Sequence, residues 1–206
     1  MNAIATAIVL AAGESRRMGD LKPLLPYGGG TVIQAVVRAL QASPVRHVVV
    51  VVGHRAEEIS ANLAGTSAEC VFNPRFAEGM LSSIRTGLTA APEETEWFVI
   101  ALGDQPALKP ALVAALVRAA QERGKGIVVP SYGGRRGHPL VIHASLRQEI
   151  AELDPALGLR ELLRRHPEAV HHVVVGDEAV LADMDTPEDY RRELQRLQTG
   201  DDGPGA

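Results

Sequence analysis

Residues 4–26 read IATAIVLAAGESRRMGDLKPLLP, and this stretch decides the fold that we expect. Residues 4–10 form a continuous apolar and β-branched run, which is typical of a strand buried on both faces of a parallel sheet. The loop after the strand has two glycines that let a ligand approach the backbone, Gly13 and Gly19. It also has three cations that favour an anion: Arg16, Arg17 and Lys22. The stretch therefore predicts an anion-binding loop at the end of a buried strand.

The same kind of apolar run recurs along the chain and alternates with helical patterns. Strands are predicted over 4–10, 47–53, 98–102, 126–130 and 170–175, with a short strand or hairpin arm over 137–142. Helices are predicted over 31–42, 57–64, 81–90, 110–123, 144–153, 159–165 and 187–197, with Thr31 as an N-cap. Because strand and helix alternation builds parallel sheets through right-handed crossovers, we expect an α/β fold with a three-layer, Rossmann-like, doubly wound and mostly parallel sheet.

The composition limits the organisation and the partners. A chain of 206 residues fits one domain, which we place over 1–198, and residues 199–206 (TGDDGPGA) have no large apolar side chain, so we expect a flexible tail. The formal net charge of −4 argues against a general nucleic-acid binder, and the single cysteine, Cys70, excludes an intramolecular disulfide. The start lacks the basic region of a signal peptide, and no apolar run approaches the roughly 20 residues of a membrane span. We therefore expect a cytoplasmic protein without nucleic-acid or membrane partners.

Polar side chains follow three of the predicted strands. They belong to the loop after Leu10, to GDQP (103–106) after Leu102, and to ADMDTPED (182–189) beyond the last strand. Ligands of open α/β sheets bind outside the carboxyl ends of the strands, so we expect these segments to form one cleft. The first loop matches neither the Walker pattern nor the dinucleotide-binding fingerprint, and a solvated strand-to-helix loop is the alternative on composition alone.

The first loop also carries a recognisable signature. The pattern L-A-A-G-x-S-x-R-M-G-x-x-K-x-L-L-P, filled by residues 10–26, resembles the signature of the MobA-like nucleotidyltransferases. Further segments follow in the order of the branch that transfers cytidylyl groups to the molybdenum cofactor: NPRFAEGMLSSIRTGL (73–88), ALGDQP (101–106), GHPLVI (137–142) and DMDTPEDY (183–190). The resemblance covers nearly the whole chain except the tail. It implies a nucleotide-diphospho-sugar transferase-like fold, and a reaction of CTP with molybdopterin or its molybdenum-loaded form that gives molybdopterin cytosine dinucleotide and pyrophosphate.

The resemblance implies that the first loop binds the nucleotide. Arg17 and Lys22, with loop N–H groups, are suited to the β- and γ-phosphates, and with Asp104 they form the expected catalytic set. The motifs imply a set of nucleotide-binding residues: Leu10, Ala11, Ala12, Gly13, Ser15, Met18, Gly19, Gly79 and Ser83. The attacking group is a phosphate monoester with a second pKa of about 6, so the reaction requires no general base.

A triphosphate also calls for a hard divalent cation. Mg²⁺ prefers one or two carboxylates together with phosphates and waters, and Mn²⁺ can replace it. The resemblance assigns Asp104 of GDQP as a metal ligand, and Asp185 is the expected second carboxylate. Asp183 or Glu188 could take its place, or Asp185 could cap the last helix.

Two further segments concern the base and the acceptor. The guanylyl-transferring branch usually reads L-A-G-G in the first loop, so Ala12 favours cytosine, and Ser83 stands where related cytidylyltransferases have a serine that faces cytosine. The family's GHP turn borders the pterin, which makes Gly137 and His138 acceptor-binding candidates, together with Arg135. A helix-surface or capping role for Ser83 and a solvated hairpin at 131–141 are the alternatives.

Two other functions fit the same sequence. The related fold also serves nucleotidyl transfer to other phosphorylated acceptors, including guanylyl transfer to the molybdenum cofactor. A chaperone that binds this cofactor and delivers it to a recipient molybdoenzyme is the other alternative. The intact set of Arg17, Lys22 and Asp104 favours catalysis, which an assembly role could accompany.

Overall fold

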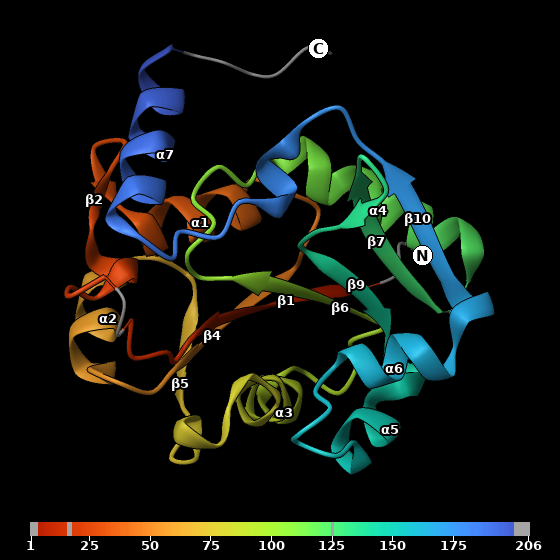
Figure 1. Cartoon of the computed structure of the whole chain (residues 1–206). Helices are drawn as coiled ribbons and strands as arrows, with labels where there is room; N and C mark the ends of the chain where they lie inside the picture. Colours follow the sequence, from red (N-terminus) through yellow and green to blue (C-terminus); the bar gives the residue numbers. More distant parts are fainter. Residues whose placement is uncertain (1–3, 16–17, 125, 200–206) are drawn as a thin grey trace.

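The computed structural model describes residues 4–15, 18–124 and 126–199 (Figure 1). Within these residues the chain builds an eight-stranded sheet in the order β10-β7-β9-β6-β1-β4-β5, with β8 paired to β7 outside this path. The strands are β1 (Ala5–Ala11), β4 (His47–Val52), β5 (Glu69–Phe72), β6 (Trp97–Leu102), β7 (Ile127–Tyr132), β8 (Arg135–Arg136), β9 (Leu140–His143) and β10 (Val170–Val174). The pairs β4–β1–β6, β4–β5 and β7–β10 are parallel, whereas β9 runs antiparallel to both β6 and β7. The predicted mostly parallel sheet is therefore confirmed.

Helices cover both faces of this sheet and complete three layers (Figure 1). They are α1 (Val32–Gln41), α2 (Ala56–Asn62), α3 (Met80–Ala90), α4 (Pro110–Arg123), α5 (Arg147–Glu152), α6 (Arg160–Arg165) and α7 (Pro187–Thr199). Helices α1, α2 and α4 share one apolar core with Val9 of β1, whereas α3, α5 and α6 share the other core with Ile8. Successive residues of a strand point to opposite faces, which is why these two neighbours are buried on different sides. None of the described helices is long and apolar enough to span a membrane.

The order of the strands reverses at β1. The chain runs from β1 to β4 and β5 on one side of β1 and then returns to β6 on the other side. Leu10, near the end of β1, lies in register with Val51 of β4 and Leu102 of β6. Ligands of open α/β sheets bind at such a reversal. The first loop and the GDQP segment therefore start side by side at the edge where a ligand is expected.

Local signals set the helix boundaries. Thr31 caps α1, since its Oγ1 accepts a hydrogen bond from the Gln34 N–H at 3.4 Å and its own N–H donates to the Gln34 side chain at 3.1 Å. Pro110 opens α4, and Gly124 follows the end of α4 with a φ of 74°, in the left-handed region. Both residue types are placed where their backbone preferences favour a helix start and a helix stop.

Some elements differ from the predicted pattern. β5 is a partly exposed edge strand, so it lacks the continuous apolar run that marks the inner strands. A hairpin of β2 (Pro26–Tyr27) and β3 (Gly30–Thr31) precedes α1. The predicted helix over 144–153 is split into a 3₁₀ turn (Ala144–Leu146) and α5. Further 3₁₀ turns stand at Lys22–Leu24, Phe76–Glu78, Pro167–Ala169 and Glu178–Leu181.

The end of the chain also differs from the prediction. Helix α7 lies beside α1 and β2 (Figure 1) and packs on a small core of Tyr27, Val32 and Met184. It continues to Thr199, beyond the predicted end at 197, because Leu194 and its neighbours are anchored on that core. Residues 200–206 of the predicted tail lie outside the described residues.

Candidate active site

A cavity of about 440 Å³ opens at the carboxyl ends of β1 and β6. Four segments that are distant in the sequence contribute to its wall, and most of the predicted nucleotide-binding residues are among them. The lining residues are Leu10, Ala11, Ala12, Gly13, Ser15, Lys22, Pro23, Phe76, Gly79, Met80, Ser83, Leu102, Gly103, Asp104, Asp183 and Asp185. The structure thus brings the first loop, GDQP, the start of α3 and the DMDTPED segment into one cleft.

Lys22 connects three of these segments. Its Nζ donates to Oδ2 of Asp104 at 3.1 Å and to Oδ1 of Asp185 at 2.7 Å. The lysine opens the 3₁₀ turn Lys22–Leu24, and its backbone N–H donates to Oγ of Ser15 at 3.1 Å, which ties this turn to the start of the loop. The side chain is 11 % exposed, so a nearly buried ammonium lies between two carboxylates.

The charges in this cluster depend on one another. Burial opposes the charged form of Lys22, but the hydrogen bonds and charges of Asp185 and Asp104 outweigh it, so the pKa of Lys22 is raised. Burial also raises the pKa of Asp104, with a further contribution from nearby Asp183, and the lysine only partly offsets this. A carboxylate in such a place is stable only beside a cation.

The DMDTPED segment presents two acidic side chains to the cavity. Asp185 accepts from Lys22, and Asp183 accepts from Nε2 of Gln105 at 2.9 Å. The capping role considered for Asp185 is taken by its neighbour, because Oγ1 of Thr186 accepts from the Asp189 N–H at 3.3 Å and the Thr186 N–H donates to the Asp189 carboxylate at 2.8 Å. Asp185 is therefore oriented to the cleft.

Glu188, the other alternative ligand, is placed differently. Its side chain is exposed on α7 and pairs with Arg191 at 2.9 Å. It does not line the cavity. Asp183 is thus the only one of the two alternatives that reaches the cleft.

The donor set fits a hard divalent cation. Asp104 and Asp185 both accept hydrogen bonds from the same nitrogen, Nζ of Lys22, so their oxygens lie close enough to share a cation. Mg²⁺ usually takes one or two carboxylates and completes its shell with phosphates and waters. Within residues 4–15, 18–124 and 126–199, no group of three or more His, Cys, Asp or Glu side chains could hold a metal ion. These two carboxylates suit a cation that arrives together with a phosphate ligand.

One wall of the cavity is formed at the start of α3. Gly79 has a φ of 102°, which favours glycine, and both Gly79 and Ser83 line the cavity. Phe76 and Met80 line it as well. Neither was predicted as a site residue, although both lie inside the segment 73–88. The sequence signal that could have identified them is an aromatic and a thioether side chain close to Gly79, a predicted site residue.

Ala12 also lines the cavity, and Gly53 lies against both Ala12 and Phe76. The Ala12 carbonyl accepts from the His54 N–H at 3.2 Å, and a Cβ on Gly53 would lie 2.9 Å from the Ala12 methyl and 2.6 Å from Cβ of Phe76. Ala12 is 5 % exposed, so its methyl is mostly covered by β4 and Phe76.

Some predicted nucleotide-binding residues are not brought to the cavity. Met18 and Gly19 do not line it, and Gly19 is exposed with a φ of 75°. Their assignment rested on the motif, which extends beyond the part of the loop that faces the cleft. Arg17 lies outside the described residues, so its predicted role stays a prediction.

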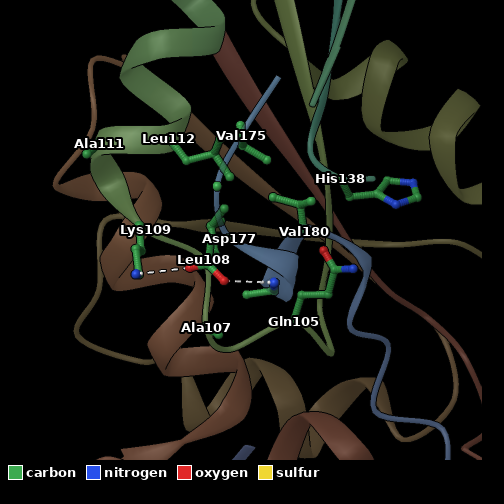
Figure 2. A pocket seen from close by; sticks show the side chains of 12 residues that line it. Gln105, Ala107, Leu108, Lys109, Ala111, Leu112, His138, Val175, Asp177 and Val180 are labelled. Carbon is green, nitrogen blue, oxygen red and sulfur yellow. Dashed lines mark hydrogen bonds and ion pairs between the residues drawn. The ribbon is translucent and has the colours of Figure 1, made fainter. Parts of the chain in front are cut away.

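A second cavity has a volume of about 160 Å³ (Figure 2). It is lined by Gln105, Ala107, Leu108, Lys109, Ala111, Leu112, His138, Val175, Gly176, Asp177, Ala179 and Val180. Lys109 and Asp177 form an ion pair at 3.0 Å on one side, and Gln105, Val180 and His138 lie on the other side (Figure 2). Because Gln105 lines this cavity and binds Asp183 of the first, the Gln105–Asp183 pair lies between the two.

The acceptor-binding candidates have different positions. His138 lines the second cavity, and burial lowers its pKa, which favours the neutral imidazole. Gly137 packs on the backbone, since a Cβ there would lie 2.2 Å from the carbonyl oxygen of Val180. Arg135 is exposed in β8 and lines neither cavity, because the short β7–β8 turn directs it to solvent.

Curated relatives match most of the chain. Nicotine blue oxidoreductase of Paenarthrobacter nicotinovorans is 33% identical over 198 residues, with 92% of this chain and 96% of the relative covered. Molybdenum cofactor cytidylyltransferase of Escherichia coli K12 is 28% identical over 185 residues, with 89% and 92% covered. A probable molybdenum cofactor guanylyltransferase of Opitutus terrae is 36% identical over 133 residues, with 63% of each chain covered.

A solved structure and a family profile agree with these relatives. The crystal structure of a Mycobacterium tuberculosis H37Rv protein in complex with manganese is 28% identical, covers 94% of this chain and 99% of its own, and superposes with a TM-score of 0.80. The profile of the MobA-like NTP transferase domain matches residues 7–170, a range that contains most of β1, the first loop, α3 and the GDQP segment. With the reversal of strand order at β1 and the cleft outside it, this match shows that the chain belongs to the MobA-like NTP transferase domain family.

Proposed function

We propose that the protein transfers CMP from CTP to the phosphate of molybdopterin or of the molybdenum cofactor, releasing pyrophosphate and forming molybdopterin cytosine dinucleotide. The observation that carries the proposal is Lys22 between Asp104 and Asp185 at the floor of a cleft outside β1. This arrangement combines a cation for phosphate oxygens with carboxylates for a metal. The resemblance to the Escherichia coli cytidylyltransferase over 89% of the chain supports the choice of substrates.

The residues of the cleft match the demands of the reaction. An oxygen of the acceptor phosphate attacks the α-phosphorus of CTP, the bond from that phosphorus to the bridging oxygen breaks, and pyrophosphate leaves. Lys22 and the N–H groups of the loop at Gly13 would stabilise the charge on the β- and γ-phosphates. Asp104 and Asp185 would hold Mg²⁺ or Mn²⁺, which supplies positive charge against the phosphates when bound. Arg17 is proposed to bind the β- and γ-phosphates with Lys22, and Met18 and Gly19 are proposed to contribute to nucleotide binding.

The acceptor is proposed to lie on the side of the second cavity. His138 lines that cavity, and the hydrogen bond from Gln105 to Asp183 links its wall to that of the first. Gly137, which packs on the Val180 carbonyl, would hold the turn that presents His138 to the acceptor. Arg135, exposed on β8, would bind the phosphate of an acceptor that extends out of the cavity. A recipient molybdoenzyme would collect the product from this side.

The decisive experiment combines purified protein, Mg²⁺ or Mn²⁺, molybdopterin and each nucleoside triphosphate in turn. We expect pyrophosphate and a pterin dinucleotide with CTP. A preference for GTP would overturn the base assignment and favour guanylyl transfer, the activity named for the Opitutus terrae relative. Absence of a dinucleotide with all four nucleotides would overturn the enzymatic proposal, and retained pterin binding in that case would favour the chaperone.

A further inference from the structure

Asn73 lies buried beneath the start of α3, where its backbone and its side chain form hydrogen bonds with several segments. It directly follows β5, its backbone N–H donates to the Val52 carbonyl at 2.8 Å, and the residue is 1 % exposed. Its Oδ1 accepts from the Arg75 N–H at 2.9 Å. Because a backbone N–H can only donate, this bond fixes which end of the amide is oxygen and which is nitrogen.

The nitrogen end of this amide faces two serine hydroxyls. Nδ2 of Asn73 lies 2.9 Å from Oγ of Ser82 and 3.1 Å from Oγ of Ser83. An amide nitrogen has two protons to donate and accepts no hydrogen bond. Both hydroxyls must therefore accept from Asn73, and each must direct its own proton elsewhere.

The two serines differ in the acceptor that is available to the hydroxyl proton. Oγ of Ser82 lies 2.8 Å from both the Arg75 carbonyl and the Gly79 carbonyl, so its proton has a partner inside the protein. The Ser83 hydroxyl has no hydrogen-bond acceptor among the described residues, although Ser83 is only 4 % exposed. Ser83 lines the nucleotide cavity, and Ser82 does not.

We propose that Asn73 is a positioning residue that makes the Ser83 hydroxyl a hydrogen-bond donor towards the nucleotide base, and that it thereby favours cytosine over guanine. Cytosine offers a hydroxyl donor two adjacent acceptors, O2 and N3. At the matching positions guanine carries the N1–H and N2–H₂ donors, and its O6 acceptor stands where cytosine has its N4 amino group, so a hydroxyl donor that faces O2 and N3 of cytosine is left unpaired by guanine. A buried donor without a partner is strongly disfavoured, so the direction of one proton discriminates between the bases. This inference rests on the proposed function for the identity of the ligand.

The test replaces the donor end of the amide by an acceptor without changing the shape of the side chain. In Asn73→Asp, the new carboxylate oxygen accepts from Ser83, so the hydroxyl turns its proton inward and presents lone pairs to the base. We expect the ratio of kcat/KM for CTP to that for GTP to fall by about tenfold or more in Asn73→Asp and in Ser83→Ala. In the Asn73→Asp/Ser83→Ala double variant the ratio should equal that of Ser83→Ala alone. Ser82→Ala is the matched control and should keep the wild-type ratio.

Calorimetric binding of CTP and GTP to the same variants supplies a readout that needs no acceptor. An unchanged CTP-to-GTP preference in Ser83→Ala would overturn the inference whether or not Asn73→Asp folds, and so would an unchanged preference in folded Asn73→Asp. If the wild type makes the cytosine dinucleotide but the variants keep its preference, the inference fails and the proposed function stands. If the preference for CTP binding depends on Asn73 but no dinucleotide forms, the proposed function fails and the inference stands.

Discussion

Nζ of Lys22 lies 2.7 Å from Oδ1 of Asp185, although 163 positions separate the two residues in the chain. The same nitrogen binds Asp104 at 3.1 Å. The lysine is therefore the counter-ion of both carboxylates. Without it, the negative charges of Asp185 and of the largely buried Asp104 would repel each other. A metal bound to these carboxylates would compete with the lysine for the same oxygens, and the triphosphate would offer the ammonium new partners.

Replacing Lys22 by Met tests this arrangement. We expect kcat for nucleotidyl transfer to fall by about 10²–10³-fold, the usual effect of removing one charge-stabilising donor from an active site. We also expect Mn²⁺ to bind the nucleotide-free variant more tightly than the wild type, because the two carboxylates lose their internal cation. Electron paramagnetic resonance titration of Mn²⁺ measures this binding without any turnover.

The control for Lys22→Met removes a cation that has no role in the cleft. Arg191 pairs with Glu188 on the exposed side of α7, so Arg191→Met should leave both turnover and Mn²⁺ binding unchanged. Weaker Mn²⁺ binding in Lys22→Met would contradict the competition between lysine and metal.

Replacing Asp104 by Asn should abolish turnover while the protein stays folded. Burial already raises the pKa of Asp104, so loss of its charge relieves a desolvation cost even as the metal loses a ligand. We expect a melting temperature within a few degrees of the wild type and weaker Mn²⁺ binding in the presence of CTP. Glu188→Gln is the matched control and should keep both properties, since Glu188 is exposed on α7. A normal rate in folded Asp104→Asn would exclude Asp104 as the metal ligand.

Gly87 allows α3 to approach the sheet closely. A Cβ at this position would lie 2.3 Å from Cγ2 of Ile8 and 3.1 Å from Cγ2 of Val51. Alanine favours a helix over glycine by about 1 kcal/mol, but overpacking a core costs about 1–3 kcal/mol, and here the clash is with two buried β-branched side chains. We expect Gly87→Ala to lower the free energy of unfolding, measured in urea, by about 1–2 kcal/mol.

The control for Gly87→Ala lies two positions away in the same helix. Thr89 is exposed, so Thr89→Ala should change the free energy of unfolding by less than about 0.5 kcal/mol. A Gly87→Ala variant as stable as Thr89→Ala would contradict the close approach of α3 to β1 and β4.

Glu193 makes the stability of the protein depend on pH. It is 3 % exposed on α7, Oε1 accepts from Arg196 at 3.3 Å, and Oε2 has no hydrogen-bond partner among the described residues. Burial raises its pKa, so the folded state favours the protonated acid. That contribution to stability is fully present below the unfolded glutamate pKa of about 4.3, and it is lost as the pH rises through the higher folded pKa.

Glu193→Gln removes this dependence. We expect its melting temperature to match the wild type near pH 4 and to exceed it at neutral pH. Glu188 on the same helix has a pKa lowered by Arg191, so Glu188→Gln should show no gain at neutral pH. A difference between Glu193→Gln and the wild type that shrinks as the pH rises would contradict this account.

Much of the fold was predictable because its signals are local. The apolar runs of β1, β4 and β6 and the boundaries of α4 depend on neighbouring residues, and the structure places them within a residue or two of the prediction. β5 was not predicted, because an edge strand is partly exposed and has a weaker pattern of apolar residues. The 3₁₀ turn within 144–153 was not predicted, because the Ala144 N–H donates to the carbonyl of Glu96, a residue distant in the sequence.

The candidate site was predictable only as a set of segments. The motifs identified Lys22, Asp104 and Asp185, and all three line one cleft. Motif membership did not separate Met18 and Gly19, which do not line it, from Phe76 and Met80, which do. Which residue of a segment faces a cleft depends on its backbone angles and on the elements packed behind it.

The sequence by itself determined the alternation of strands and helices, the family and the side chains available for chemistry, because these are properties of single residues and their near neighbours. The tertiary structure decided which of those side chains meet. The bridge from Lys22 to Asp185 and the orientation of the Asn73 amide both require segments held together by two buried cores. Contacts of this kind arise from packing over the whole chain, so they exist only once the sheet and its helices have formed.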